Sequence, residues 1–216
     1  MPVSNFVRSL CAGMALAAAP ALLAQQWEVG AQGGGSLYLN NSVTGSRGSG
    51  DVGFKPGIAA GGWLGHSTGG RLGGEIRYLF QRNDMKVSSG GTSYAFGGVA
   101  HSVHYDLLIH KGSSEDQVRP FFAVGGGIKG YRGTGKEVAL QPLINVAILT
   151  QTQQWQPMLS FGGGVKWSLG PRTLLRAEVR DFVTPFPTDV ILPTPGNKVS
   201  GWVHSITPLI GISYTF

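Results

Sequence analysis

Apolar and polar residues alternate along most of the chain with a period of two, which is typical of β-strands with two unlike faces. The C-terminal stretch LIGISYTF (Leu209–Phe216) is one example. Eight such segments follow one another, each of about the ten residues that a tilted strand needs to cross a bilayer. They are Trp27–Leu39, Phe54–Leu64, Arg71–Gln81, Thr92–Ile109, Val118–Tyr131, Gln156–Leu169, Arg172–Val183 and His204–Phe216.

The two faces of these segments differ in character. One column is apolar in most of them, and the alternate column carries the charged residues. The charged side chains that we expect to point to the inside of a closed sheet are Glu28, Glu75, Arg77, Lys129, Lys166, Arg176, Glu178 and Arg180.

Alternation alone does not separate a soluble sandwich from a membrane barrel, but the lengths of the connections do. Connections 40–53, 82–91, 132–155 and 184–203 are long, and they alternate with the short connections 65–70, 110–117 and 170–171. If each strand pairs with its sequence neighbour, all the long connections fall at one end. This asymmetry is typical of outer-membrane barrels, which have short periplasmic turns and long external loops.

Aromatic residues of the apolar column fall at two levels of this arrangement. Such girdles mark the two interfaces of a membrane-embedded barrel. The predicted girdle residues are Trp27, Tyr105, Phe122 and Trp167 at the short-turn end, with Phe216 beside them, and Phe54 and Phe80 at the other end.

The N-terminal residues have the layout of a secretory signal peptide. Arg8 precedes the apolar stretch Leu10–Ala24, which is too short to span a membrane, and polar residues begin at Gln25. We expect residues 1–24 to be the leader and 25–216 the barrel domain, with cleavage after Ala24 and Ala21 as the alternative. The only cysteine, Cys11, would leave with the leader.

The composition supports an exported strand protein. The chain has 35 glycines, and only 13% of its residues are charged, about half the share of an average soluble domain. Without Arg8, 16 Lys and Arg stand against 11 Asp and Glu.

The leader, the rhythm of strands and loops and the closing ISYTF together resemble the small eight-stranded OmpA-like outer-membrane barrels of Gram-negative bacteria. The resemblance implies an all-β, up-and-down antiparallel barrel with a structural or surface-interaction role. It also implies that the terminal strand is read by the barrel assembly machinery. The residues that match this signal are Ile210, Ile212, Tyr214 and Phe216.

An eight-stranded barrel has an interior just wide enough for side chains to fill. We therefore expect the inward charges to pair as a plug, because buried charges must be paired or hydrated. The alternative is a narrow porin-like channel for ions or small solutes, in which the excess of Lys and Arg would select anions.

A third hypothesis is a lipid-modifying enzyme or a protease, and its polar candidates are His101, Ser102, His104, Asp106, His204 and Ser205. The pairs His101–Ser102 and His204–Ser205 are adjacent in sequence, so their side chains point to opposite faces of a strand. His104 and Asp106 share a face, but no nucleophile lies two residues away. We therefore predict no catalytic residues.

We also expect no cofactor, no metal site and no nucleic-acid partner. The glycine runs Ala123–Tyr131 and Ser160–Trp167 resemble phosphate-binding loops only in composition, because no helical period follows them. Glycine in these runs relieves crowding in a narrow barrel instead.

The predicted external loops carry more basic than acidic residues, which suits contact with outer-membrane lipid and lipopolysaccharide phosphates, although a merely solvated surface is an equal alternative. The candidate contacts are Arg47, Lys55, Arg82, Lys86, Arg132, Lys136 and Lys198.

Two loops contain apolar stretches, Val138–Leu149 and Pro185–Asn197. They indicate either a surface for an extracellular partner on loops 132–155 and 184–203 or an extension of the strands above the membrane. A ninth and a tenth strand would widen the barrel, but Pro142 and Pro193 argue against them.

Overall fold

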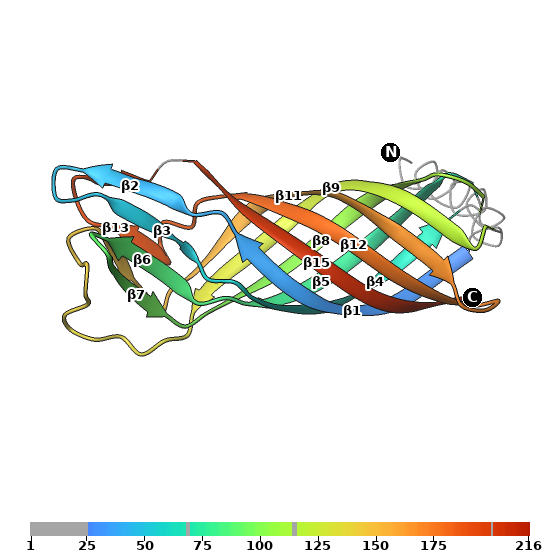
Figure 1. Cartoon of the computed structure of the whole chain (residues 1–216), viewed down its shortest axis with the longest axis horizontal. Coiled ribbons are helices and arrows are strands. Elements are labelled where there is room, and N and C mark those ends of the chain that lie inside the picture. The colour runs from blue at the N-terminus through green and yellow to red at the C-terminus, as the bar shows by residue number, and fades with distance from the viewer. Residues whose placement is uncertain (1–25, 68–69, 114–115, 200) are drawn as a thin grey trace, which may run out of the picture.

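The computed structural model describes residues 26–67, 70–113, 116–199 and 201–216, and the predicted leader lies outside these ranges. Eight long strands close into an antiparallel barrel (Figure 1). Its wall is made of β1 (Gln26–Tyr38), β4 (Gly57–Ser67), β5 (Leu72–Arg82), β8 (Gly98–His110), β9 (Val118–Gly133), β11 (Gln153–Ser168), β12 (Thr173–Pro185) and β15 (Trp202–Thr215). No helix in the described ranges is long and apolar enough to cross a membrane.

The barrel closes where β15 pairs with β1. The backbone amides of Trp27 and Phe216 donate to each other's carbonyl oxygens at 3.1 and 3.0 Å. Register partners followed once around the wall from Glu28 lead back to Tyr38 on the same strand, ten residues further on. This stagger gives strongly tilted strands and a narrow interior.

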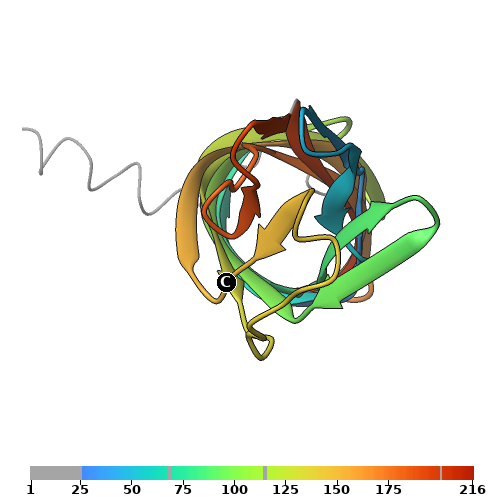
Figure 2. The same cartoon turned by 90° about the vertical axis from the view of Figure 1, so that its left-hand side faces the viewer.

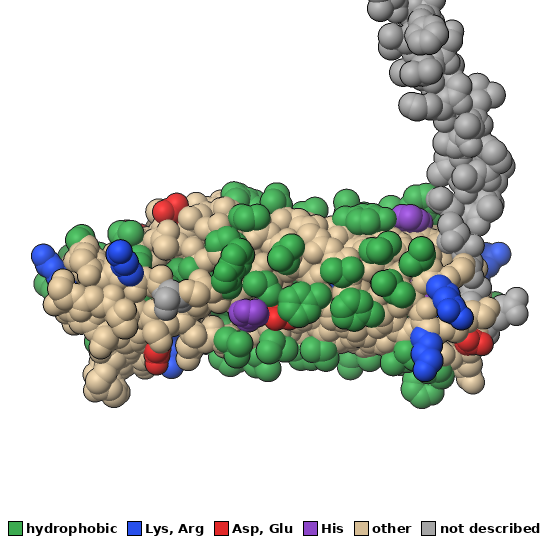
Figure 3. Space-filling view, turned by 90° about the horizontal axis from the view of Figure 1, so that it is seen from above, with side chains coloured by type: hydrophobic (Ala, Val, Ile, Leu, Met, Phe, Trp, Pro, Cys, Tyr) green, Lys and Arg blue, Asp and Glu red, His purple; other side chains and the backbone are tan. Residues whose placement is uncertain are grey.

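The period of two that is visible in the sequence becomes the inside and the outside of the wall. On β8, Ser102, His104 and Asp106 are at most 2% exposed, whereas the intervening Val103 and Tyr105 are more than 40% exposed. A closed sheet satisfies its own backbone hydrogen bonds, so this outer face suits a hydrocarbon environment. Figure 3 shows hydrophobic side chains over the middle of the barrel and Lys and Arg side chains toward its two ends.

The long connections all lie at one end, opposite the short turns and the C-terminus (Figure 1). They are more ordered than the sequence indicates, because a second sheet continues the wall with the strand order β14–β2–β3–β6–β7. Its strands are β2 (Asn41–Gly45), β3 (Gly50–Phe54), β6 (Met85–Ser89), β7 (Thr92–Phe96) and β14 (Asn197–Val199). Gly90 and Gly91, both at positive φ, form the turn between β6 and β7.

The two apolar loop stretches pair with each other across the mouth of the barrel. β10 (Ala147–Leu149) and β13 (Ile191–Pro193) form a separate two-stranded sheet, and Figure 2 shows both inside the ring of wall strands. Their buried side chains belong to an apolar cluster that we call the cap. Its members are Val43, Val52, Phe54, Met85, Val87, Phe96, Ala100, Tyr131, Val146, Ala147, Leu149, Phe186, Val190, Ile191 and Val203. The barrel therefore has eight strands, and the ten-strand alternative is wrong.

The structure corrects two further details. Phe54, predicted as an outward girdle residue, is 5% exposed and stacks on Tyr131 inside the cap, because it ends the loop strand β3 rather than starting a wall strand. The predicted single strand Thr92–Ile109 is divided at Gly97, whose carbonyl oxygen accepts bonds from the amides of Thr134 and Gly135.

Candidate functional site

Charged side chains from two opposite walls meet in the middle of the barrel. β5 and β12 are four places apart in the ring of eight strands, so their inward residues face each other across the lumen. Glu75 and Arg77 project from β5, and Arg176, Glu178 and Arg180 project from β12, all at most 4% exposed. We call these five residues, with Asp106 of β8, the central network.

Glu75 is the most heavily engaged member of the central network. Arg176 donates to both of its carboxylate oxygens, at 2.7 and 2.9 Å. Arg77 donates to it at 2.6 Å and Arg180 at 3.4 Å. A two-pronged Arg–carboxylate contact is among the strongest charge-assisted hydrogen bonds.

Glu178, on the opposite wall, is a second carboxylate that accepts hydrogen bonds from several guanidinium groups. It accepts from Arg176 at 2.8 Å, and it also accepts from Arg77, which reaches across from β5. The Arg176 guanidinium lies between aromatic faces, 4.9 Å from the ring centroid of Trp63 and 4.4 Å from that of Phe121. These contacts fix its position in the cross-section.

Asp106 completes the charge balance of this layer. It accepts from Arg180, and its Oδ2 lies 3.3 Å from Nε2 of His104, the partner predicted from their shared face. Three guanidinium groups therefore face three carboxylates. The charges of these six groups cancel, so the predicted excess of basic side chains is absent from the central network.

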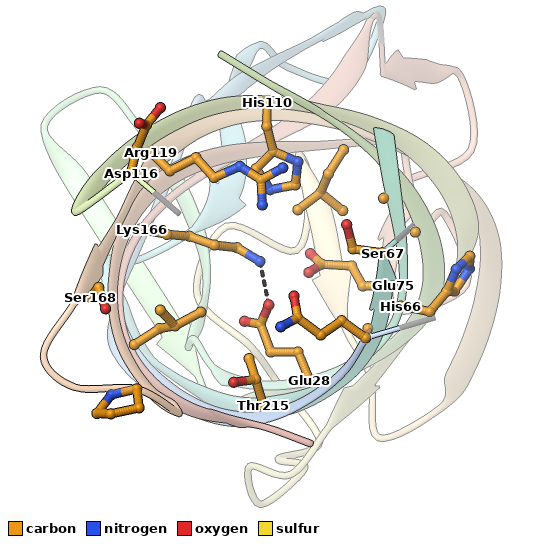
Figure 4. Close-up of a pocket in the computed structure, with 17 residues that line it drawn as sticks. Glu28, His66, Ser67, Glu75, His110, Asp116, Arg119, Lys166, Ser168 and Thr215 are labelled. Atoms are coloured by element: carbon orange, nitrogen blue, oxygen red, sulfur yellow. Dashed lines mark hydrogen bonds and ion pairs between the residues drawn. The ribbon is translucent and has the colours of Figure 1, made fainter. Parts of the chain in front are cut away.

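A smaller ion pair lies nearer the short-turn end. Lys166 of β11 donates to Glu28 of β1 at 2.5 Å, and Trp63 donates to the same carboxylate at 3.1 Å. Figure 4 shows this pair beside a cavity of about 100 Å³ that is also lined by His110, Arg119 and Asp116. A space of this size holds a few water molecules.

Lys129 lies in the lumen, as predicted, but apart from the central network. It is fully buried, and its ammonium group donates to the Tyr38 hydroxyl at 3.1 Å. The rings of Tyr38, Tyr131 and Phe182 surround it at 5.0 to 5.8 Å. None of the ion pairs of the described residues includes Lys129, so cation–π contacts take the place of a carboxylate.

Apolar side chains fill the lumen between the central network and the cap. Ala59, Leu79, Met158, Phe182 and Leu209 form one cluster, each at most 3% exposed. The side-chain amide of Gln81 donates to the hydroxyls of Ser205 and Thr207 at 3.1 and 3.3 Å. The alternation in the sequence predicts that these side chains point inward, but it does not predict which of them contact one another.

The histidines considered for catalysis lie in two different environments. His104 is inside the barrel beside Asp106. His204 is on the outer face, where its Nδ1 lies 2.8 Å from Oδ2 of Asp181, a residue that the sequence analysis did not single out. In the part of the chain that the structure describes, neither imidazole has a hydrogen bond to a Ser, Thr or Cys side chain.

His101 is also on the outer face, in the apolar column as the alternation indicates. Its Nδ1 lies 2.8 Å from the Tyr78 hydroxyl, and its ring centroid is 5.2 Å from that of Phe80. This pairing gives the His101 imidazole a hydrogen-bond partner among apolar neighbours. No group of three or more potential metal ligands occurs within the described ranges.

The other predicted girdle residues lie on the outer face. Tyr105, Phe122, Trp167 and Phe216 are each about half exposed or more, and Trp27 and Phe80 are partly exposed. Trp155 and Trp202, both about half exposed near the loop-side ends of β11 and β15, were missed because the sequence placed them in loops.

The residues predicted as an assembly signal form the outward face of β15. Ile210, Ile212, Tyr214 and Phe216 are each at least 45% exposed. β15 pairs with β1 on one side and with β12 on the other, so these side chains lie next to the closing seam.

The basic residues predicted to contact lipopolysaccharide are distributed over the loop end. Arg47 lies between β2 and β3, Lys198 lies in β14, and Lys86 is partly buried in β6. Lys55, Arg82, Arg132 and Lys136 are exposed nearer the wall.

No protein-family model and no curated protein matches the sequence, but solved structures match the fold. Neisserial surface protein A (NspA) is similar with a TM-score of 0.53 and 13% identity, over 89% of this chain and 97% of that one. The outer membrane protein OprG from Pseudomonas aeruginosa gives a TM-score of 0.55 and 12% identity, over 88% and 95%. The predicted all-β fold, an antiparallel barrel closed by eight strands, is confirmed, and both of these outer-membrane proteins have a similar fold.

Proposed function

We propose that the chain is an integral outer-membrane protein with a structural or surface-interaction role, whose lumen is closed to ions and solutes. A barrel of this size offers little space beyond its own side chains. The role would then be performed by the outer wall and the external loops rather than by a pore or a catalytic centre.

The central network is the observation that carries this proposal. Six charged side chains span the cross-section from wall to wall, and their three positive charges balance their three negative charges. An ion passing this level would have to separate buried ion pairs, each of which costs several kcal/mol to break, on the order of 3–5. The apolar cluster around Phe182 and the cap follow on the loop side, and their mainly apolar side chains are poor ligands for a permeating ion.

The runner-up function, an anion-selective channel, receives less support from the same geometry. Its premise is an excess of inward Lys and Arg, yet Lys166 is paired with Glu28 and the three arginines of the central network are balanced. Lys129 is enclosed by aromatic rings instead of lining a path.

Conductance in a planar bilayer tests the proposal. We expect no steady channel from the wild-type barrel, and insertion is verified separately by the heat-dependent shift of the folded protein on electrophoresis. As a matched comparison, Glu75→Ala combined with Arg176→Ala removes side chains from both walls, whereas Asp51→Asn changes one exposed loop charge. Steady, anion-selective openings of the wild type would contradict the closed lumen.

For the surface role, we propose that an external partner would meet the side chains that the cap leaves outside. Val146, Ala147, Leu149, Phe186, Val190 and Ile191 of the two loop stretches are buried in the cap, but Leu140 is 81% exposed, and Val138, Ile144 and Leu192 are also exposed. Replacing Leu140 by Ser would weaken such a contact without disturbing the cap.

A further inference from the structure

Basic residues gather on one side of the loop-end boundary of the barrel. Lys55, Arg82, Arg132 and Lys136 all belong to β5, to β9 or to the connections beside the ends of β4 and β9. At the same level the opposite side, formed by β12, β15 and β1, carries Asp181, His204 and Trp202. Basic residues spread evenly around the barrel would favour no single position for an anion, whereas basic residues on one side favour binding at that side.

Arg82 and Arg132 are held at a fixed spacing by the sheet. Val99 of β8 is the register partner of Arg82 on one side and of Arg132 on the other. Neighbouring strands are about 4.8 Å apart, so the two Cα atoms lie roughly 10 Å apart on the same outer face. Both residues are exposed and lie at the loop-side ends of their strands.

Both guanidinium groups are available to a ligand as far as the described residues show. In the described ranges, no ion pair or hydrogen bond engages the side chain of Arg82 or Arg132. The nearby acids Asp84 and Glu137 form no ion pair with either arginine in the described ranges, and Glu137 accepts from the backbone amide of Gln151.

An apolar and aromatic wall lies directly below the two arginines. Phe80 is two residues before Arg82 on the same face, and Ile128, which is 50% exposed, lies below Arg132. His101 lies between them and contacts Phe80. Trp155 of the neighbouring strand β11 covers Gly130 of β9. Two guanidinium groups that can donate hydrogen bonds to an anion therefore lie next to an outer surface that suits acyl chains.

We propose that Arg82 and Arg132 form a binding site for a lipid headgroup with two phosphates, namely a bisphosphorylated glycolipid of the outer leaflet. The proposal deepens the proposed function, since it requires the barrel to lie in the membrane with its loops outward. Each guanidinium would take one phosphate, and the acyl chains would lie along Phe80, His101 and Ile128. One acidic phosphate would engage only half of the site.

The test is a binding titration of the detergent-solubilised barrel by native mass spectrometry. The probes are bisphosphorylated lipid A, monophosphorylated lipid A and phosphatidylglycerol. Arg82→Gln combined with Arg132→Gln is compared with Arg47→Gln combined with Lys198→Gln, which removes the same charge from loop positions outside the site. The heat-dependent shift on electrophoresis verifies that both variants are folded.

We expect the wild type to bind bisphosphorylated lipid A about tenfold or more tightly than the other two probes, and the Arg82 and Arg132 variant to lose that preference. The Arg47 and Lys198 variant should keep it. Equal losses in both variants, or equal affinity of the wild type for all three lipids, would overturn the site. The conductance test involves neither arginine, so a failed lipid site would leave the closed lumen standing.

Discussion

Glu75→Gln is the perturbation that isolates the central network. The substitution keeps the shape of the side chain but removes the charge that three guanidinium groups share, with contacts from Arg176 at 2.7 and 2.9 Å and from Arg77 at 2.6 Å. Glu75 is 1% exposed, so water cannot replace the lost carboxylate. Removing one partner of a buried pair costs about 3–5 kcal/mol, and we expect the free energy of unfolding to fall by that amount.

Urea-induced unfolding in lipid vesicles measures this loss. Arg176→Gln and the double variant complete a mutant cycle, and the double variant should lose less than the sum of the two single losses, with a coupling of about 2 kcal/mol or more. The exposed Asp51→Asn should change stability by no more than about 0.5 kcal/mol. If Glu75→Gln costs no more than that control, or if the cycle is additive, the central network does not hold the two walls together.

Two further predictions concern the wall and the cap. Gly34→Ala should destabilise the barrel by about 1–3 kcal/mol, because the new Cβ would collide with the carbonyl oxygen of Pro208, whereas at Gly33 the nearest atom is 3.8 Å away and Gly33→Ala should be tolerated in the same unfolding assay. Leu149 is fully buried in the cap, so Leu149→Ala should lower the free energy of local opening of the cap by about 2–5 kcal/mol. Hydrogen exchange should then become faster at residues 141–150 and stay unchanged in β12. Equal acceleration in both segments would show that the cap does not open as a separate unit.

The wall of the barrel could be predicted from the sequence because membrane strands have one dominant signal. The alternation of apolar and polar residues fixes both the strand and the direction of each side chain, and a shift of one residue would turn every charge toward lipid. For that reason Arg176, Glu178 and Arg180 all lie inside the lumen, where the sequence placed them.

Partner choice within the lumen could not be predicted in the same way. Which carboxylate meets which guanidinium depends on the stagger of the closed sheet, and the sequence does not state that stagger. The stagger brings Asp106 to Arg180 and leaves Lys129 among aromatic rings. It also places Asp181 beside His204 on the outer face, a contact between neighbouring strands with no sequence motif.

The loops were the least predictable part for a different physical reason. Their strands are three to five residues long, too short for a periodic signal to stand out. Phe54 shows the consequence, because its side chain is equally compatible with an outward girdle and with the cap. Only the pairing of β3 with β6 turns it inward.

The central claim is that lipid contacts the outer face of the barrel and that side chains fill its interior. Spin labelling along β8 tests this claim most directly. Single-cysteine variants at Ser102, Val103, Leu107 and Leu108 are made with Cys11, the only native cysteine, replaced by Ser, and are reconstituted into vesicles. We predict that labels at Val103 and Leu107 collide with oxygen, which dissolves in lipid, and that labels at Ser102 and Leu108 collide with neither oxygen nor a water-soluble nickel reagent. Strong collision of the nickel reagent at Val103 and Leu107 would show that water contacts the outer face and would contradict the account.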